Sequence, residues 1–350
     1  MRSLTWLALL PFTWIACSTP EAPSPGGSSS SSASSSSGGG TSASTTGSGS
    51  TGGAGSTRGS SVTSGAGGGS SSSASGTGGG TEGTRLRVVA ANLTSGNDQS
   101  YDPGAGLRII QGVHADVVLM QEVNYGLDTV EDMRKITDDL CGQDCTMARG
   151  AGQIPNAVIS RYPILASGAW VDPKVENRDF TWARIDIPGP IDLWAVSVHL
   201  LTSSESERKD EAAALVVQLQ AMVPPGDLLV MGGDFNTKSR DEAALTTLSA
   251  RFSVTGPYAA DGAGNDNTNT ARTKPYDWVL ASPELRALET PVRVGATYFK
   301  AGLVVDTRVY TPLSDLSPAE TTDSDAPNMQ HMAVVRDFLV VGEPVTSGGI

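Results

Sequence analysis

Apolar residues follow two patterns along the chain beyond residue 85. Short, nearly continuous apolar runs that end in polar residues are typical of buried strands, whereas apolar residues three or four positions apart indicate helices. The predicted strands span residues 86–92, 116–123, 157–160, 181–187, 192–199, 227–231, 276–280 and 332–341. The predicted helices span residues 106–114, 127–140, 204–222 and 241–250.

The order of the predicted elements indicates the fold class. Two neighbouring strands meet at Pro188-Gly189-Pro190 as a hairpin, while other strands alternate with helices. This mixture favours an α/β domain in which two mixed β-sheets pack as a sandwich with flanking helices, a four-layer α-β-β-α architecture.

Composition limits this domain to the chain after residue 84. Residues 18–84 are almost entirely Ser, Gly, Thr, Ala and Pro, with hardly any charge and no apolar periodicity. Such a segment cannot bury enough apolar surface to offset the entropy of ordering, so we expect a disordered tether. Residues 85–350 are enough for one α/β domain with a large core.

The first 17 residues have the features of an export signal. Arg2 gives a positive start, and residues 4–15 form an apolar run too short to span a bilayer. Ala16-Cys17 follows and is similar to a bacterial lipobox, although Trp14 stands where Leu is usual. We expect Cys17 to be lipidated and to anchor an exported protein to the membrane of the cell envelope. The alternative is an ordinary cleaved signal and secretion.

The two other cysteines, Cys141 and Cys145, lie four positions apart. In an exported chain this spacing favours a small-loop disulfide. A zinc site needs two more ligands, and no further His or Cys lies near them in the sequence.

The chain has a formal net charge of −13, which lies after residue 84 because the charges before it cancel. An acidic domain is a poor non-specific binder of nucleic acid and of anionic membranes. Metal ions can offset acidic site residues, so the charge does not exclude an enzyme that acts on phosphodiesters.

Polar side chains suited to phosphoester chemistry stand at the ends of the predicted strands. Hydrolysis of a phosphate ester needs a base that activates water, a metal that offsets phosphoryl charge, and donors for the phosphoryl and leaving oxygens. Mg²⁺ prefers a few hard oxygen ligands. Loops at strand ends can converge on one cleft, and we expect this of Asn92, Glu122, His199, Asp234, Asn236, Asp277 and His331.

Seven segments carry a resemblance to a known family. The segments are VVAAN, ADVVLMQEV, PNAVISRYPI, LWAVSVHL, MGGDFNT, YDWVLAS and QHMAVV. Their order and rough spacing resemble those of the endonuclease/exonuclease/phosphatase family, which includes pancreatic-type deoxyribonucleases. Each segment alone is a weak signal, but chance does not readily place all of them in order. The resemblance covers nearly all of residues 85–341 and implies a metal-dependent phosphoesterase.

The resemblance also implies where metal and phosphate bind. Glu122 matches the main metal ligand of the family, and Asn92 stands beside it. Asn236 matches the amide that holds a phosphate oxygen. Asn156 matches a recurrent Asn near the cleft, and we assign it to substrate binding; the alternative is that it only shapes the start of its strand.

The catalytic groups are implied in the same way. Asp234 matches the Asp that orients or deprotonates the attacking water. His199 stands where some members have a His and others a Tyr, in contact with phosphate or serving the leaving group. Asp277 matches the Asp of an Asp-aromatic pair, and His331 matches the late catalytic His, whose imidazole suits proton transfer.

One motif departs from the family. The family usually reads Ser-Asp-His at the end, with the Asp orienting the His, but here Gln330 precedes His331 and the pair Ser324-Asp325 lies earlier. Asp325, Gln330 and Asp277 are then the three candidate acceptors for the His331 ring. Without a well-placed Asp, the ring's tautomer is less fixed and the rate falls.

We therefore expect a monomeric catalytic domain that hydrolyses phosphate esters with Mg²⁺ or Mn²⁺. Nucleic acid is the leading substrate, on family prevalence. A phospholipid or sugar-phosphate phosphoesterase is the second interpretation, and the low aromatic content of 5% counts against the lipid. The third is a catalytically impaired surface protein that binds a partner, which the altered last motif suggests and the other retained site residues oppose.

Overall fold

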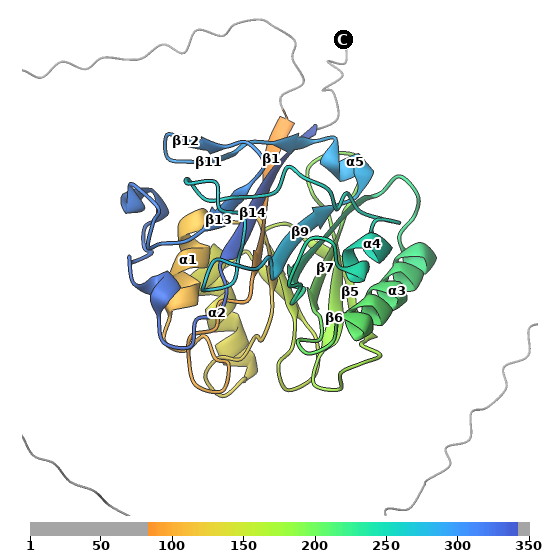
Figure 1. Cartoon of the computed structure of the whole chain (residues 1–350), viewed down its shortest axis with the longest axis horizontal. Coiled ribbons are helices and arrows are strands. Elements are labelled where there is room, and N and C mark those ends of the chain that lie inside the picture. Colours follow the sequence, from red (N-terminus) through yellow and green to blue (C-terminus); the bar gives the residue numbers. More distant parts are fainter. Residues whose placement is uncertain (1–82, 342–350) are drawn as a thin grey trace, which may run out of the picture. The chain divides into compact units, whose positions relative to one another are not determined.

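The computed structural model describes residues 83–341, in which two β-sheets pack face to face with helices on both outer sides (Figure 1). The predicted signal segment 1–17 with Cys17, and most of the predicted tether 18–84, lie outside the described residues. Among the helices of residues 83–341, none is both long enough and apolar enough to cross a membrane.

The first sheet is built around two long strands, β1 (Gly83–Ala91) and β14 (Ala333–Val341), which pair antiparallel. β1 also pairs in parallel with β2 (Val117–Met120). The other strands of this sheet are β3 (Thr146–Arg149), β4 (Ala157–Ser160), β10 (Glu289–Thr290) and β13 (Leu303–Val305). Their order is β10-β14-β1-β2-β4-β3, with β13 also paired to β14.

The second sheet has the order β5-β6-β7-β8-β9, and within it the β7–β8 pair is parallel while its neighbours are antiparallel. Its strands are β5 (Ile164–Val171), β6 (Asp179–Ile185), β7 (Leu193–His199), β8 (Leu228–Asp234) and β9 (Asp277–Ala281). A separate hairpin joins β11 (Val292–Val294) to β12 (Thr297–Phe299).

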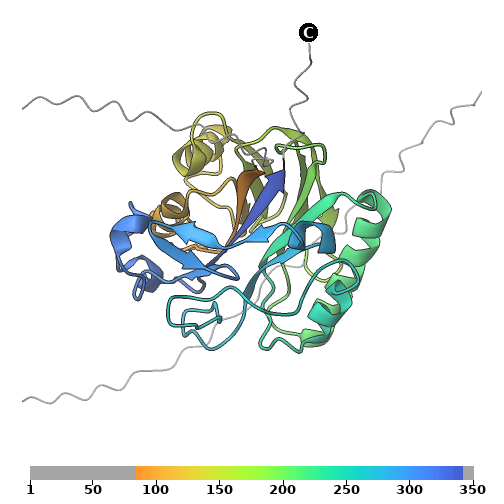
Figure 2. The same ribbon diagram turned by 90° about the horizontal axis from the view of Figure 1, so that it is seen from above.

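Three apolar layers hold the sandwich together. Side chains such as Leu119 and Val230 fill the space between the sheets. Ile110 and Ile136 pack α1 and α2 on the first sheet, and Leu215 packs α3 on the second (Figure 2). The helices are α1 (Ala105–Val113), α2 (Val130–Cys141), α3 (Glu205–Met222), α4 (Ala243–Leu248), α5 (Pro283–Arg286) and the short 3₁₀ helices η1 (Leu313–Leu316) and η2 (Asp323–Asp325). The predicted α-β-β-α order of layers is confirmed.

Side-chain caps set the helix starts. Ser204 accepts a hydrogen bond from the Glu207 backbone N–H, so α3 begins where the sequence predicts. The start predicted for α2 at residue 127 is wrong, because Thr129 and Asp132 form a reciprocal capping box and the helix begins after it.

The end of β2 also differs from the prediction. The strand stops at Met120, not at residue 123, because the next side chain turns to join the two sheets. Gln121 donates from Nε2 to Ser197 Oγ at 2.9 Å, and Ser197 Oγ donates to the Met120 carbonyl at 2.7 Å. These buried hydrogen bonds lie directly behind the strand ends that carry the candidate site.

Strands β3, β5 and β10 to β13 were not predicted. β5 is an edge strand that contains Gly168 and leaves most of its side chains exposed or half-buried, so it lacks the apolar run that marks a buried strand. β10 to β13 are only two or three residues long. Such short strands form through their sheet partners, and no pattern within them is long enough to read.

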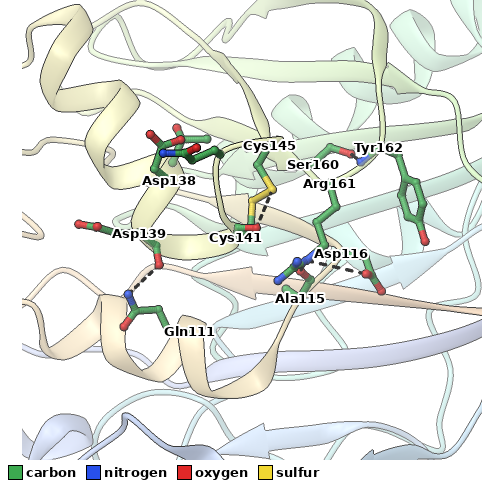
Figure 3. The surroundings of a disulfide bond; sticks show 12 residues. Gln111, Ala115, Asp116, Asp138, Asp139, Cys141, Cys145, Ser160, Arg161 and Tyr162 are labelled. Carbon is green, nitrogen blue, oxygen red and sulfur yellow. Dashed lines mark hydrogen bonds and ion pairs between the residues drawn. A yellow bond between two sulfur atoms is a disulfide. The ribbon is translucent and has the colours of Figure 1, made fainter.

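Cys141 and Cys145 are joined by a disulfide (Figure 3). The bond links the last residue of α2 to the residue before β3, so it ties the helix to the edge of the first sheet. On the other side of α2, Gln111 of α1 donates from Nε2 to the Asp139 carbonyl at 2.7 Å. The end of α2 is therefore connected both to the start of β3 and to α1.

Candidate active site

Strand register brings three site residues together from distant parts of the sequence. β7 and β8 run parallel and pair His199 with Asp234. β8 and β9 run antiparallel and pair Asp234 with Asp277. One row across three neighbouring strands therefore carries His199, Asp234 and Asp277 in this order, and Asp277 lies on the edge strand β9.

The first sheet supplies two further groups from the ends of its parallel pair. β1 and β2 finish at Ala91 and Met120, which are paired, and Asn92 and Glu122 follow shortly after them. Asn92 Nδ2 donates to Glu122 Oε1 at 3.2 Å and to Asp234 Oδ2 at 3.1 Å. Asn92 thus connects the carboxylates of the two sheets.

Two of these residues have backbone angles that side chains rarely adopt. Glu122 has φ 53° and Asn236 has φ 51°, both in the left-handed region. Asn adopts this region more readily than most residues, but for Glu122 the conformation costs about 1–3 kcal/mol, and such strain clusters at functional sites. The turn at Glu122 directs its carboxylate toward Asn92 and toward Thr94 Oγ1, which donates to Glu122 Oε2 at 3.1 Å.

Asn236 is held on both sides. Its backbone N–H donates to Asp234 Oδ1 at 2.8 Å, and its Nδ2 donates to Asp234 Oδ2 at 3.1 Å and to the Leu200 carbonyl at 3.0 Å. The preceding Gly233 has φ 141°, and a Cβ there would meet the Val198 carbonyl at 2.0 Å. Only glycine fits at that point, which lies in β8 directly before Asp234.

The strand ends open into a cleft of about 290 Å³. Five predicted site residues line it: Glu122, His199, Asp234, Asn236 and His331. The other lining residues are Gln99, Ile154, Asn177, Arg178, Thr202, Tyr276 and Gln330. A polar cleft with convergent carboxylate, amide and imidazole groups is the arrangement that phosphoester hydrolysis requires.

Asp277 is the acceptor for the His331 ring. His331 Nδ1 lies 3.0 Å from Asp277 Oδ2, and its Nε2 lies 3.4 Å from Asp234 Oδ2. Asp325 is exposed and lies 3.7 Å from Arg308, while Gln330 lines the open side of the cleft. The residue directly before the His is therefore not what orients it in this chain.

Burial and neighbouring charges shift the pKa values of the site. Burial raises the pKa of Asp234 to about 6, against the opposing effect of His331. Burial lowers the pKa of His199 well below its usual value, and Arg178 lowers it further. Burial also lowers the pKa of His331, but Asp277 and Asp234 outweigh it and raise that pKa to about 10. With no cation bound, His199 is neutral at neutral pH and His331 is protonated.

Buried polar atoms without a partner show where a cation fits. Within residues 83–341, such atoms include Asn92 Oδ1 and His199 Nδ1, and His199 Nδ1 lies 3.7 Å from Glu122 Oε1. Ligand atoms of Asp234, Asp277 and His331 also lie within 4.8 Å of one another. Two sets of residues could therefore hold a divalent cation: Glu122 with Asn92, and the group of Asp234, Asp277 and His331.

Asn156 is the predicted substrate contact that the structure does not place in the cleft. It is fully buried, and its Nδ2 donates to the Asp179 carbonyl at 2.6 Å. Its own carbonyl accepts from Thr181 Oγ1 at 3.0 Å. These bonds tie the entry to β4, the strand that Asn156 directly precedes, to the start of β6.

Sequence reasoning missed several supporting residues. Thr268 Oγ1 accepts from the Asp277 N–H at 2.7 Å, and the Tyr276 ring lies 5.7 Å from the His331 ring. Tyr276 directly precedes Asp277 and could have been found by that position, but Thr268 lies in a loop without any local signal. Thr94, beside Glu122, likewise follows a strand end and could have been included.

The sequence matches the family model described as the endonuclease/exonuclease/phosphatase family over residues 101–315. No curated protein matches the chain. The matched segment spans more than half of the chain and contains most of the residues that line the cleft.

Solved structures share the fold. The endonuclease/exonuclease/phosphatase from Bacteroides vulgatus is 17% identical, with 73% of this chain and 99% of that chain covered and a TM-score of 0.50. The protein of the same description from Beutenbergia cavernae is 19% identical, with 74% and 72% covered and a TM-score of 0.52. At these identities the likeness supports the fold alone.

Proposed function

Because this chain belongs to the endonuclease/exonuclease/phosphatase family, we propose that it hydrolyses phosphate esters with the aid of Mg²⁺ or Mn²⁺. The observation that carries the proposal is the row of His199, Asp234 and Asp277 across one sheet, facing Glu122 from the other. Structural packing alone gives no reason to gather these groups, because buried charge is costly unless it is used or compensated.

Glu122 and Asn92 are the residues we assign to the metal. Glu122 offers a carboxylate and Asn92 an amide oxygen with no other partner, which are the hard ligands that these cations prefer. When bound, the cation supplies positive charge that offsets the phosphoryl oxygens and favours the ionised form of the nearby carboxyl groups.

Asp234 and Asn236 act on the attacking water and on the phosphoryl group. Asp234 holds its carboxylate with two hydrogen bonds from Asn236, so its position is fixed before substrate arrives. In its ionised form it orients or deprotonates the water. His199 is neutral, and its Nε2 lies 3.3 Å from Asp234 Oδ2. From Nε2 it can donate a hydrogen bond to a phosphoryl oxygen.

His331 is the group suited to the leaving oxygen. It is protonated, lines the cleft and is held by Asp277, so it can donate a proton from Nε2 as the ester bond breaks. The proton that Asp234 accepts from water returns to solvent, and His331 regains from solvent the proton that it gave to the leaving oxygen, which resets the site.

Phosphodiesters of nucleic acid are the substrate class that we propose first, on family membership. Arg178 is the one Lys or Arg among the residues that line the cleft, so few contacts with further phosphates come from the cleft itself. The second candidate is therefore a phospholipid or sugar-phosphate ester, which needs a single phosphoryl site. A catalytically impaired binding protein is the third; the intact His331–Asp277 pair counts against it.

Export and anchoring remain a proposal from the sequence pattern before residue 18. We propose that Cys17 is lipidated and that the catalytic part acts outside the cytoplasm. Detergent-phase partitioning of the full chain and of Cys17→Ala tests this. The lipoprotein requires that only the unsubstituted chain enters the detergent phase; partitioning of both into water favours secretion.

A substrate panel tests the activity. The full chain is assayed on bis-p-nitrophenyl phosphate, plasmid DNA, a phospholipid and a sugar phosphate, with Mg²⁺, with Mn²⁺ and with EDTA. We expect cleavage that EDTA abolishes, and the relative kcat/KM values identify the substrate class. No cleavage of any of the four by a folded protein favours the binding protein.

A further inference from the structure

Two acidic side chains are buried against each other behind the cleft. Asp172 follows β5 and is 4% exposed, and Glu211 lies in the middle of α3 and is fully buried. Their carboxyl groups are within hydrogen-bond reach of each other. Neither residue lines the cleft, and the proposed reaction uses neither of them.

The contacts of this pair require a proton between them. Asp172 Oδ1 accepts from the Lys174 N–H at 2.8 Å, whereas Asp172 Oδ2 is buried with no donor. Both oxygens of Glu211 accept from the Leu201 N–H, at 3.0 Å. Two ionised carboxylates have no donor to offer each other, so the contact is a hydrogen bond only if one carboxyl group keeps its proton.

The pair joins two segments that carry cleft residues. Asp172 begins the loop that leads to Arg178, whose Nε donates to the His199 carbonyl at 2.6 Å and whose Nη2 donates to the Leu200 carbonyl at 3.2 Å. Glu211 accepts a hydrogen bond from the N–H of Leu201, the residue directly after Leu200. The Leu200 carbonyl also accepts from Asn236 Nδ2, so the segment after β7 connects the pair to two cleft residues.

The charges around the pair come from three elements. Lys174, in the loop after β5, forms an ion pair of 2.6 Å with Asp210 of α3 at the solvent side, and Glu207 of α3 also faces Lys174. Arg178 faces the pair from the cleft side and interacts in turn with Asp234 and Glu122. Lys174 is paired with Asp210. Arg178 lowers the pKa of both Asp172 and Glu211, but burial outweighs this effect.

We propose that Asp172 and Glu211 share one proton and that this carboxyl–carboxylate pair positions the segments which present Arg178 and Asn236 to the cleft. Glu211 and Asp172 are positioning residues, since they act through the Leu201 N–H and the loop to Arg178. Burial is the largest influence on the pKa of Glu211, which is raised to about 8, and Asp172 raises it further. The shared proton is therefore kept at neutral pH and lost in mildly alkaline solution.

The shared proton makes the stability of the fold depend on pH. The folded chain keeps a proton that an unfolded Glu loses near its ordinary pKa, so the pair stabilises the fold at low pH. That contribution falls as the pH rises from about 4.5 toward 8. Glu211→Gln replaces the protonated carboxyl by an amide of the same shape, which donates to Asp172 without a titrating proton.

The experiment compares unfolding temperatures of the full chain and of Glu211→Gln between pH 5.5 and 9.5, with Glu205→Gln at the exposed start of α3 as the matched control. We expect the unfolding temperature of the original chain to fall relative to that of Glu211→Gln as the pH rises. The original chain and Glu205→Gln, which both retain Glu211, should give parallel curves. Asp172→Asn should reproduce the Glu211→Gln curve, which keeps the test open if one variant does not fold.

Two further readouts separate positioning from simple packing. The infrared band of protonated carboxyl groups should be weaker in Glu211→Gln than in the original chain at pH 7.5. The alkaline decline of kcat/KM on whichever substrate proves active should shift to higher pH in Glu211→Gln. Parallel stability curves for the original chain and Glu211→Gln would overturn the proposal. So would a cation retained by the original chain and lost in Glu211→Gln, because two ionised carboxylates would then bind a metal and not a proton.

Discussion

His331 Nδ1 lies 3.0 Å from Asp277 Oδ2, although 54 residues separate the two in the sequence. The contact identifies Asp277 as the acceptor for the His331 ring, in preference to Asp325 and Gln330. Asp277 is positioned by its backbone N–H, which donates to Thr268 Oγ1, and by its place at the start of β9 beside Asp234. The sheet, and not the local motif, fixes the imidazole.

Asp277→Asn should therefore impair turnover severely. The amide cannot stabilise a protonated ring and favours the wrong tautomer, which in a comparable His–Asp pair costs about 10⁴-fold in kcat. We expect a loss of kcat of at least roughly 10²-fold with little change in KM. Asp325→Asn, at the exposed acid of the displaced Ser-Asp pair, is the matched control and should keep its activity.

Restoring the family motif should not compensate. Gln330→Asp places a carboxylate directly before His331, but Nδ1 of the ring already faces Asp277. We expect the double variant Gln330→Asp with Asp277→Asn to stay as inactive as Asp277→Asn alone. A double-mutant cycle on kcat measures this. Recovery of activity in the double variant would show that the residue before the His can orient it.

The sequence predicted the site better than it predicted the sheets. Asn92, Glu122, His199, Asp234 and Asp277 all stand where a clear apolar strand ends or begins, so the strand pattern located them. Their convergence required only that these strand ends meet at one edge of the sandwich.

Other features depend on contacts that no local pattern encodes. β5 is an edge strand, and its mixed exposure hides it from periodicity. Asn156 was assigned to substrate binding by resemblance, but its Nδ2 donates a hydrogen bond to the Asp179 carbonyl. The sequence left three candidates for the residue that orients His331. Strand register decides among them, because it places Asp277 beside Asp234.

Protons and metal should compete at the site. Burial raises the pKa of Glu122 above its usual value and that of Asp234 to about 6, so both carboxyl groups take up protons at higher pH than exposed acids do. Metal binding needs the ionised forms. We expect the rise in unfolding temperature caused by Mg²⁺ to be small at pH 5 and to grow toward pH 7.5. A hundredfold excess of Mg²⁺ over its Kd should stabilise the fold by about 2.7 kcal/mol.

Glu122→Gln is the variant that checks this assignment. It keeps the shape of the side chain but removes the charge that attracts the cation, so the Mg²⁺-induced rise should vanish at every pH. Glu284→Gln, in the first turn of α5 and exposed, should retain the full effect. An undiminished rise in Glu122→Gln would move the metal to Asp234, Asp277 and His331.

The pair Arg208–Glu242 should matter for stability and not for the chemistry. Arg208 of α3 is fully buried and donates to both Glu242 oxygens, at 2.8 and 2.7 Å. Glu242→Ala leaves that charge unpaired and should lower the free energy of unfolding by about 3–5 kcal/mol. Asp210→Ala breaks the exposed pair with Lys174 and should lower the free energy of unfolding far less, because solvent screens exposed ion pairs. Urea denaturation measures the free energy of unfolding of both variants. Equal losses in Glu242→Ala and Asp210→Ala would contradict a stabilising role for the buried Arg208–Glu242 pair.

The most direct test of the proposed function is the initial rate of bis-p-nitrophenyl phosphate hydrolysis by the full chain, His331→Ala and His114→Asn. His114 is exposed at the end of α1 with φ 51°, a conformation that Asn tolerates, so it is the matched control. The account predicts metal-dependent hydrolysis by the original chain and by His114→Asn, abolished by EDTA, with a loss of about 10²–10⁴-fold in His331→Ala. Hydrolysis that persists in EDTA, or that His331→Ala retains in full, would contradict it.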